Sequence, residues 1–332
     1  MKNSGNWHRL IHSKVSAIGR EQTISTSILE QIMKIRKNYF FLSILMMSLS
    51  LLPVVAVAAE STAVVGARKA LEDFLIDWNA SDLIAIQDHL NFPHVTHNSS
   101  NIIVAQSKGE FVQDFQQLRR QGWRRSTFDH FQVLQGSDNK VNFLVDFRRY
   151  DENDAVLFSG KVFYVVTRQD GRWGMQYRSG GPPPSQFSEA ELDRIKLEAT
   201  TAIYNFFAAF NAADTEALSA VNHVPQAMLV NDFFVYAEDW SSPLLNPNFS
   251  QMMENENWSH STVEDIEVIH AMPGKVIFQL EFERFNTNGE KYAIVPALWV
   301  LTKVGDKWGI QYRSLMAPRA GELSNPFLNN AP

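Results

Sequence analysis

Apolar side chains recur at helical spacing in two separate stretches of the chain. In the first stretch they occupy positions i, i+4, i+7, i+8 and i+11, and the same pattern returns 132 residues later. This spacing places the side chains on one face of a helix, so we expect two amphipathic helices that each bury that face. The two faces comprise Ala67, Leu71, Phe74, Leu75 and Trp78 in the first helix and Ala199, Ile203, Phe206, Phe207 and Phe210 in the second.

Shorter helices are expected after each amphipathic helix. A side chain that can cap a helix N-terminus follows each amphipathic helix, Ser81 or Asp82 after the first and Asp214 after the second, and each predicts a short second helix. A third helix is expected over residues 107–122. Its later counterpart is interrupted by prolines and asparagines, so we expect only about residues 249–255 to be helical there. Both second helices are expected to end near a proline, Pro93 or Pro225.

The pattern changes to a period of two after each third helix. Residues 141–147 and 276–282 alternate between apolar and polar side chains, as half-buried strands do. Residues 156–167 and 173–179 continue the first series as further strands, with turn residues between them. Three helices followed by a four-stranded meander predict the α+β class, with an antiparallel sheet of four or more strands.

The chain contains a tandem duplication. Trp-Gly-Met-Gln-Tyr-Arg-Ser at 173–179 returns as Trp-Gly-Ile-Gln-Tyr-Arg-Ser at 308–314, which is 135 residues later. A repeat of this length is a whole domain, because solenoid repeats are much shorter. We therefore expect two tandem domains, 62–180 and 188–316, with a Gly/Pro linker at 181–187 and a C-terminal tail at 317–332.

Three segments carry a family resemblance. Phe-Pro-His-Val at 92–95, Trp-Ser-His-Ser at 258–261 and the hairpin at 164–174 resemble SnoaL-like domains of the nuclear-transport-factor-2-like superfamily. The resemblance implies a strongly curved sheet wrapped around helices, a cone with a pocket at its open end. Relatives include ketosteroid isomerase, scytalone dehydratase, polyketide cyclases, and binding or assembly domains without activity. Many dimerise through the sheet, which implies an internal pseudo-dimer here.

The N-terminal region has the pattern of an export signal. A basic stretch at 34–37 precedes an uncharged apolar run at 40–57, and Ala-Val-Ala at 56–58 suits cleavage. We expect a signal peptide at 33–58, preceded by an extension at 1–32 that is disordered or not translated, and an exported, periplasmic or secreted protein. The alternative is an uncleaved membrane anchor, since the apolar run approaches spanning length.

Composition narrows the classes of function. The chain has no cysteine, which excludes disulfides, thiolate metal sites and a cysteine nucleophile. Its net charge is −6, and cleavage of the signal would remove more basic than acidic residues, so a nucleic-acid partner is not expected. Nucleotide-binding, nucleophile-elbow, zinc-protease and calcium-loop motifs are absent from the sequence. We expect no cofactor.

Four residues are candidates for catalysis. His94 and His260 could act as bases, because imidazole titrates near neutral pH. Tyr177 and Tyr312 could donate a hydrogen bond to a substrate carbonyl. The spacing of His89, His94 and His97 would also allow a metal site, but the sequence places no carboxylate beside them. Hydrogen-bonded histidines are therefore favoured over metal ligands.

A second group comprises candidates for ligand binding. Arg149 and Arg284 share the apolar phase of their strands, where a guanidinium needs a partner. The partner could be an anionic ligand or an acid such as Asp129 or Glu264, and the structural ion pair is favoured. The tryptophans could stack on a ligand or fill the core between helix and sheet. The set comprises His97, Trp123, Arg149, Trp258 and Arg284.

The last strands supply candidates for a contact between the domains. Simple alternation places Met175 and Tyr177 on one face and Gln176 and Arg178 on the other. The pattern is the same in both copies, as expected where each patch meets its own equivalent. The expected contact residues are Gln176, Arg178, Gln311 and Arg313.

Three functions remain open at this stage. The first is an exported protein that binds small hydrophobic molecules in two cone-shaped domains, because pocket-type aromatics are abundant and no acid–base set is shared by both copies. The second is an isomerase, cyclase or dehydratase with a histidine base. The third is a pseudo-dimeric scaffold that recruits another protein.

Overall fold

The computed structural model describes residues 60–181 and 187–318, which belong to one structural unit, Glu60–Pro332. The expected extension at 1–32 and signal peptide at 33–58 lie outside the described residues, as do most of the linker and the tail. No helix in the described ranges is long and apolar enough to cross a membrane.

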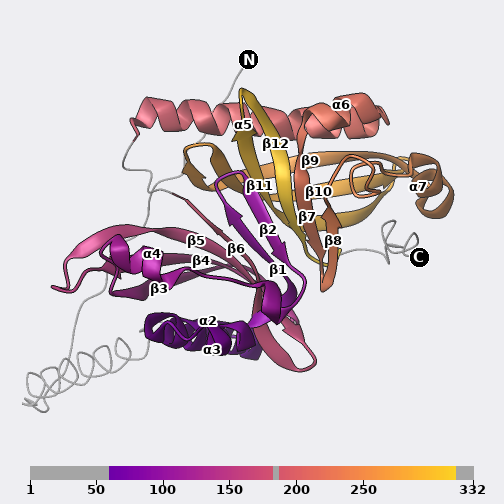
Figure 1. Cartoon of the computed structure of the whole chain (residues 1–332). Coiled ribbons are helices and arrows are strands. Elements are labelled where there is room, and N and C mark those ends of the chain that lie inside the picture. Colours follow the sequence, from indigo (N-terminus) through magenta and orange to yellow (C-terminus); the bar gives the residue numbers. More distant parts are fainter. Residues whose placement is uncertain (1–59, 182–186, 319–332) are drawn as a thin grey trace, which may run out of the picture. The chain divides into compact units, whose positions relative to one another are not determined.

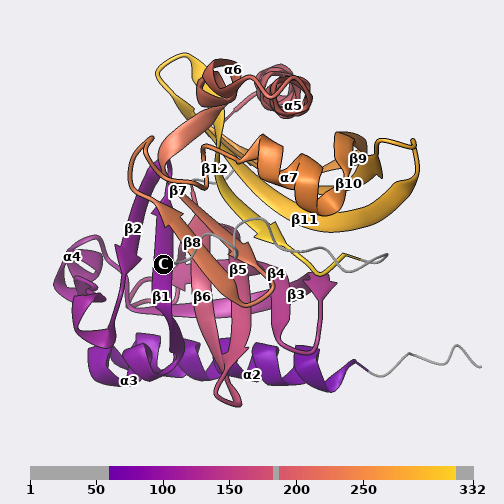
Figure 2. The same ribbon diagram turned by 90° about the vertical axis from the view of Figure 1, so that its right-hand side faces the viewer.

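The first repeat consists of helices followed by a six-stranded sheet (Figure 1). Its strand order is β2-β1-β6-β5-β4-β3. The long helix α2 lies along one face of this sheet, as both views show (Figures 1 and 2). Its elements are α2 Thr62–Ala80, α3 Leu83–Asp88, β1 Leu90–Asn98, β2 Asn101–Ala105, η1 Lys108–Glu110, α4 Phe115–Arg120, β3 Arg125–Gly136, β4 Lys140–Tyr150, β5 Val156–Gln169 and β6 Arg172–Gly180.

The second repeat has the same order of elements. Its sheet has the strand order β8-β7-β12-β11-β10-β9, which matches the first sheet position by position. The expectation of two tandem α+β domains is confirmed. The elements are α5 Glu189–Asn211, α6 Thr215–Ala220, β7 Asn222–Val230, β8 Phe233–Ala237, α7 Phe249–Glu256, β9 Trp258–Met272, β10 Lys275–Asn286, β11 Lys291–Val304 and β12 Lys307–Leu315.

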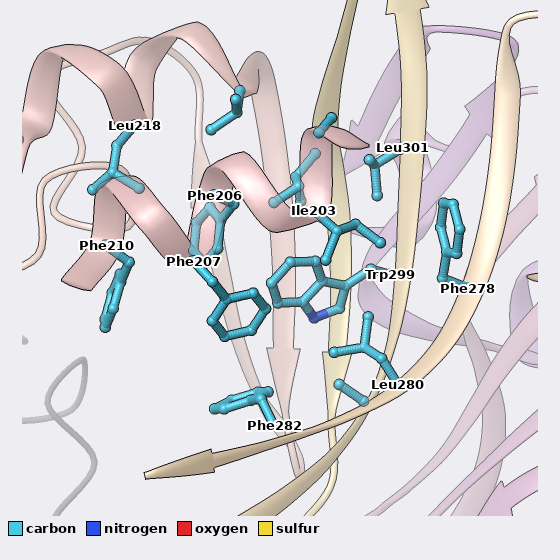
Figure 3. Packing of buried hydrophobic residues seen from close by; sticks show 14 of the residues in the cluster. Ile203, Phe206, Phe207, Phe210, Leu218, Phe278, Leu280, Phe282, Trp299 and Leu301 are labelled. Atoms are coloured by element: carbon cyan, nitrogen blue, oxygen red, sulfur yellow. The ribbon is translucent and has the colours of Figure 1, made fainter. Parts of the chain in front are cut away.

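The long helices bury the predicted faces. Four of the five predicted positions in α2 are buried, as are all five in α5. Ser61 caps α2, and Ser188 and Glu191 form a capping box at the start of α5. Figure 3 shows the aromatic side chains of α5 packed against Trp299 and Phe282 of the sheet. Helix spacing in the sequence thus translates directly into the core of each repeat.

Each sheet has two more strands than the four-stranded meander. The second helices end at Asp88 and Ala220, earlier than expected, and Pro93 and Pro225 lie inside strands, each after a cis peptide bond. Strand β1 pairs parallel with β6, so the sheet is mixed and not purely antiparallel. Buried positions occur on both faces of β1, which removes the alternation that reveals a strand.

The third helix is broken in the first repeat. The predicted helix over residues 107–122 is a 3₁₀ turn, η1, followed by the short α4. In the second repeat α7 agrees with the expected segment within one residue. Each of these helices is followed by a residue in the left-handed region, Gly122 or Asn257, immediately before a tryptophan. The two chain reversals therefore correspond in position.

A β-bulge changes the strand phase in the middle of β6. Val165 pairs with Tyr177 and Val166 pairs with Met175, so Gln176 is an extra residue in the ladder. Met175 belongs to the core under α2, whereas Tyr177 belongs to a different apolar cluster on the opposite face. Simple alternation therefore predicts the wrong face of the sheet for the residues after Gln176, because a bulge moves each following side chain to the opposite face.

The second repeat has the same bulge. Val300 pairs with Tyr312 and Leu301 pairs with Ile310, which leaves Gln311 as the extra residue. Arg178 and Arg313 thereby lie on the helix-covered face, beside the residues that line the two cavities. The bulge is what brings these arginines into the interior of each repeat.

The opposite faces of the two sheets contact each other through apolar and polar groups. Tyr177 and Tyr312 stack with ring centroids 3.5 Å apart and an interplanar angle of 13°. The Nζ of Lys140 donates to the carbonyls of Leu229 and Leu315. Lys275 stands at the position that corresponds to Lys140 in the duplication. Its Nζ donates to the carbonyls of His97 (2.8 Å) and Gly180 (3.3 Å) and to Ser179 Oγ (2.9 Å).

Candidate functional site

A cavity lies between α2 and the sheet of the first repeat. The space that it encloses is small, about 20 Å³ for the centres of water-sized molecules, whereas the empty space that includes its open mouth is about 300 Å³. Most of its wall is apolar, and three of its lining groups are cationic or phenolic. The lining residues are Phe74, Leu75, Trp78, Ser126, Phe128, Phe147, Arg149, Val162, Tyr164 and Arg178.

Two guanidinium groups share this first cavity. Arg149 is half-buried and lies 5.8 Å from the ring centroids of both Phe147 and Phe158. Arg178 lies over the Trp78 ring at 5.1 Å. In the described part of the chain neither arginine forms an ion pair. Burial and the charge of Arg178 lower the pKa of Arg149, as expected for like charges without an anion between them.

Tyr164 supplies a hydroxyl to the same cavity. Its side chain is 2% exposed. Burial raises the pKa of Tyr164, and the neighbouring Arg178 opposes that shift. The hydroxyl therefore stays protonated near neutral pH, and the cavity wall carries hydrogen-bond donors and positive charge without a lining carboxylate.

The second repeat has a corresponding cavity between α5 and its sheet. The space that it encloses is about 40 Å³ for the centres of water-sized molecules, and the empty space that includes its open mouth is about 410 Å³. Trp299 and Phe282, which Figure 3 shows facing α5, form part of its wall. The lining residues are Phe206, Phe207, Phe210, Ser261, Phe282, Arg284, Trp299, Arg313 and Leu315.

The charge of Arg284 is compensated in this second cavity. Its Nη1 lies 2.7 Å from Glu256 Oε2, and the two side chains are 9% and 3% exposed. The Tyr292 hydroxyl donates to the same carboxylate oxygen at 2.9 Å. The structural ion pair expected for Arg284 is present, although its partner is Glu256 and not Glu264. Arg148, and not Arg149, pairs with Asp129.

Several buried polar atoms at the second cavity have no hydrogen-bond partner among the described residues. They are Trp299 Nε1, Arg313 Nε, Arg284 Nε and Glu256 Oε1. Arg313 donates through Nη2 to Gln226 Oε1 at 3.0 Å, and burial lowers its pKa to about 10. A buried donor without an acceptor is costly, and three of these four atoms are N–H donors.

The predicted ligand-stacking tryptophans are core residues. Trp123 and Trp258 are 3% and 1% exposed, and neither lines a cavity. Each indole N–H donates to a serine hydroxyl, Ser126 at 2.9 Å or Ser261 at 3.1 Å. Asn79 and Asn211 in turn hydrogen-bond to the backbone of those serines. This duplicated triad joins the long helix to the sheet.

The candidate base residues lie away from both cavities. His94 is 1% exposed, with Nδ1 3.0 Å from the Met175 carbonyl and Nε2 3.4 Å from Thr96 Oγ1. Burial lowers its pKa to about 4, so it is neutral near pH 7. His260 stacks on the Phe285 ring with centroids 4.7 Å apart. No histidine lines either of the two cavities.

The remaining candidates divide between the contact of the two sheets and the cavities. His97 Nδ1 lies 2.7 Å from the Tyr177 hydroxyl, and Nε2 lies 3.1 Å from Gln311 Oε1. Gln311 also donates to the Ser100 carbonyl at 2.9 Å, so it contacts the first repeat. Gln176 accepts from Thr167 within its own sheet. His97, Tyr177 and Tyr312 therefore belong to the contact between sheets, whereas Arg178 and Arg313 belong to the cavities.

Sequence reasoning did not identify several cavity residues. The sequence pattern does not indicate Tyr164 and Trp299 as cavity residues or Glu256 as the partner of Arg284, and simple alternation places Arg178 and Arg313 on the other face. The duplication contains one usable signal, because Gln121 in the first repeat aligns with Glu256 in the second at the 135-residue offset. Among the described residues, no group of three or more histidine, aspartate or glutamate side chains could hold a metal.

Comparison with known proteins extends only to the fold. No family model and no curated protein matches the sequence. An NTF2-like protein with a cystatin-like fold from Novosphingobium aromaticivorans is 13% identical, covering 38% of this chain and 84% of its own, with a TM-score of 0.33.

Two other solved structures give similar values. An NTF2-like superfamily protein from Salmonella enterica serovar Typhimurium is 15% identical over 40% of this chain and 97% of its own, with a TM-score of 0.31. An uncharacterised cystatin-like protein from Caulobacter vibrioides is 12% identical over 42% and 96%, with a TM-score of 0.30. In each repeat, helices precede a six-stranded mixed sheet and cover one of its faces, so this chain contains two tandem α+β domains of the same topology.

Proposed function

We propose that this chain is a small-molecule binding protein whose ligands enter the cavities between helix and sheet. The observation that carries the proposal is the second cavity, whose wall is aromatic and where the N–H groups of Trp299 Nε1, Arg284 Nε and Arg313 Nε have no acceptor in the part of the chain that the structure describes. A ligand with an apolar body and an oxygen acceptor would satisfy both features. Ligand sites commonly combine an apolar wall with a few polar groups in this way.

The enzymatic alternative has less support. A proton-abstracting base must reach the substrate within hydrogen-bonding distance. Neither His94 nor His260 lines either of the two cavities described above, and both nitrogens of His94 have protein partners. The cavities hold aromatic rings and hydrogen-bond donors, which suit binding better than acid–base chemistry.

A binding measurement with 1-naphthamide tests the proposal. This probe has an apolar ring system and a carbonyl acceptor, and isothermal titration calorimetry would measure its affinity for the purified chain. We expect saturable binding that weakens about 2- to 10-fold in Trp299→Phe, which removes one neutral hydrogen bond but keeps the ring. Trp240→Phe is the matched control, because Trp240 is 42% exposed and lies outside the cavities. Absence of saturable binding would refute the proposal.

Native mass spectrometry provides an independent test. The protein would be purified from its own cells and compared with a denatured control. A small molecule carried by the native protein alone is the expected result, and its mass would identify the class of ligand.

We also propose that the two repeats form an internal pseudo-dimer. The support is that Lys140 and Lys275 stand at equivalent positions and each donates to carbonyls of the opposite repeat. Such reciprocity is the mark of an isologous contact. Chemical acetylation tests it: Lys140 and Lys275 should remain unmodified in the native protein while Lys69, whose side chain is 70% exposed, reacts. Rapid modification of both buried lysines would contradict the pseudo-dimer.

Export is the remaining proposal about the chain as a whole. Its support is the sequence pattern of a basic stretch, an apolar run and a small-residue cleavage site at 34–58. N-terminal sequencing of the protein from its own cells should begin at or near residue 59. A protein that retains residues 33–58 would instead favour the uncleaved anchor.

A further inference from the structure

The first cavity differs from the second in its charge. Arg149 and Arg178 both line it, and neither forms an ion pair in the described part of the chain. In the second cavity the equivalent of Arg149 is Arg284, which is paired with Glu256. The two cavities therefore share a pair of arginines but not the acid that compensates one of them.

The duplication identifies the residue that stands in place of this acid in the first repeat. Gln121 aligns with Glu256, and both residues come immediately before a left-handed residue and a tryptophan. Gln121 is exposed and carries no charge. The second group that hydrogen-bonds Glu256, Tyr292, is likewise replaced, because Leu157 stands at its position in the first repeat. Both parts of the compensating arrangement are thus absent at Arg149.

The surroundings of the two arginines favour an anion. Arg149 lies beside the rings of Phe147 and Phe158, and Arg178 lies over Trp78, so both charges are held against apolar walls. Placing two like charges in one cavity is unfavourable unless an opposite charge lies between them. A carboxylate can accept hydrogen bonds from guanidinium groups in a bidentate manner, which makes it a suitable partner.

The cavity wall also limits the body of the ligand. Phe74, Trp78, Phe128 and Phe147 contribute aromatic surface, and Tyr164 adds one protonated hydroxyl as a donor. The enclosed part of the cavity is small, and its mouth opens to solvent, so a ligand's carboxylate would point inward to the arginines while its ring system lies in the mouth against the aromatic wall. An inorganic anion would satisfy the arginines but would leave the aromatic wall without a partner.

We propose that the first cavity selects a small aromatic or aliphatic carboxylate, held by Arg149 and Arg178, and that Gln121 sets this selectivity by not being an acid. The inference rests on the proposed small-molecule binding and specifies the class of ligand for the first repeat. The second cavity, in which Glu256 compensates Arg284 and Gln226 accepts a hydrogen bond from Arg313, carries less net positive charge and takes neutral ligands with an oxygen acceptor.

The experiment compares two probes of nearly the same shape. Isothermal titration calorimetry of the full chain would measure 1-naphthoate, which is anionic, and 1-naphthamide, which is neutral. We expect 1-naphthoate to bind the first cavity about 10- to 100-fold more tightly than 1-naphthamide does, because hydrogen bonds to a charged group contribute more than neutral ones. Arg149→Gln combined with Arg178→Gln should remove this preference.

The exchange of Gln121 and Glu256 provides matched variants. Gln121→Glu should reduce the affinity for 1-naphthoate about 10-fold or more and leave that for 1-naphthamide nearly unchanged. Gln121→Asn is the control, since it keeps the side chain neutral and should leave both affinities unchanged. A circular-dichroism melt of each variant checks that the chain remains folded.

The outcomes separate this inference from the broader proposal. Equal affinities for the two probes in the natural chain, or an undiminished preference in the double arginine variant, would overturn the carboxylate site while small-molecule binding stands. Failure of both probes to bind would refute small-molecule binding itself. A preference that Gln121→Glu removes supports the carboxylate site and the role of residue 121.

Discussion

The two cavities of this chain have the same framework and different charge. The triads Asn79–Trp123–Ser126 and Asn211–Trp258–Ser261 make equivalent hydrogen bonds between helix and sheet. In contrast, an exposed Gln121 stands where a buried Glu256 compensates an arginine. The comparison teaches that residues retained between the repeats hold the fold, whereas residues that differ change the chemistry of the cavity.

The largest expected effect is at the position where the repeats differ most. Glu256→Ala leaves Arg284 buried without an anion, and we expect a loss of about 3–5 kcal/mol in the free energy of unfolding. Gln121→Ala, at the aligned position, should change it by less than about 0.5 kcal/mol because Gln121 is exposed. Urea denaturation measures both. Equal losses of stability in the two variants would show that the two aligned positions do not differ in their contribution to folding.

The next effect concerns positions that the repeats share. Burial lowers the pKa of Lys140 and of Lys275 to about 7, from an ordinary value of 10.5. Between these values the unfolded chain holds more protons than the folded chain, so stability should rise with pH by about 1.4 kcal/mol per unit for each lysine. Below pH 7 both states are protonated, and this contribution no longer changes.

Variants at the two lysines assign that pH dependence. Denaturation at pH 7.5 and 9 would compare the natural chain with Lys140→Met and Lys275→Met. Each substitution should remove about the same part of the slope, because the two lysines occupy equivalent environments. A slope that neither substitution changes would show that other groups cause it.

A smaller effect should be equal in the two repeats. Ser126→Ala and Ser261→Ala each remove the acceptor of a buried indole N–H. We expect each to lower the free energy of unfolding by about 1–2 kcal/mol. Urea denaturation of the two variants side by side provides the check, and a clear inequality would show that the shared triads do not play equivalent roles.

The smallest effect is expected at Arg149, in contrast to its equivalent, Arg284. Arg149→Gln removes a charge that has no acid partner, so the stability of the unliganded chain should stay within about 0.5 kcal/mol or increase slightly. Arg284→Gln leaves Glu256 buried and should cost several kcal/mol. Thermal melts without ligand distinguish them, and a large loss in Arg149→Gln would indicate a structural partner for that residue.

Much of the fold could be predicted because its periodicity is simple. The helical faces of α2 and α5 and the alternation in β4 and β10 place those elements directly. Arg149 and Arg284 were correctly assigned to the inner face, because no bulge separates them from Phe147 and Phe282 on that strand. Local alternation remains reliable as long as the ladder is regular.

The rest could not be predicted from local pattern. Strand β1 is covered on both faces, so its side chains do not alternate. The bulge at Gln176 has no sequence signature, and because the second repeat has it too, aligning the copies does not reveal it. That one residue reversed the assignments of Tyr177 and Arg178. The pairing of Glu256 with Arg284 depends on how α7 packs, which is a tertiary property.

The reciprocal lysine contacts join two halves of a single polypeptide. In an assembly of two identical chains, any substitution appears in both halves at once, so a change that improves one pocket alters its twin as well. Duplication within one chain removes that restriction, since each half accumulates mutations on its own. A glutamine in one half can then occupy the position that a glutamate holds in the other half. One gene can thereby encode two specificities on a shared framework.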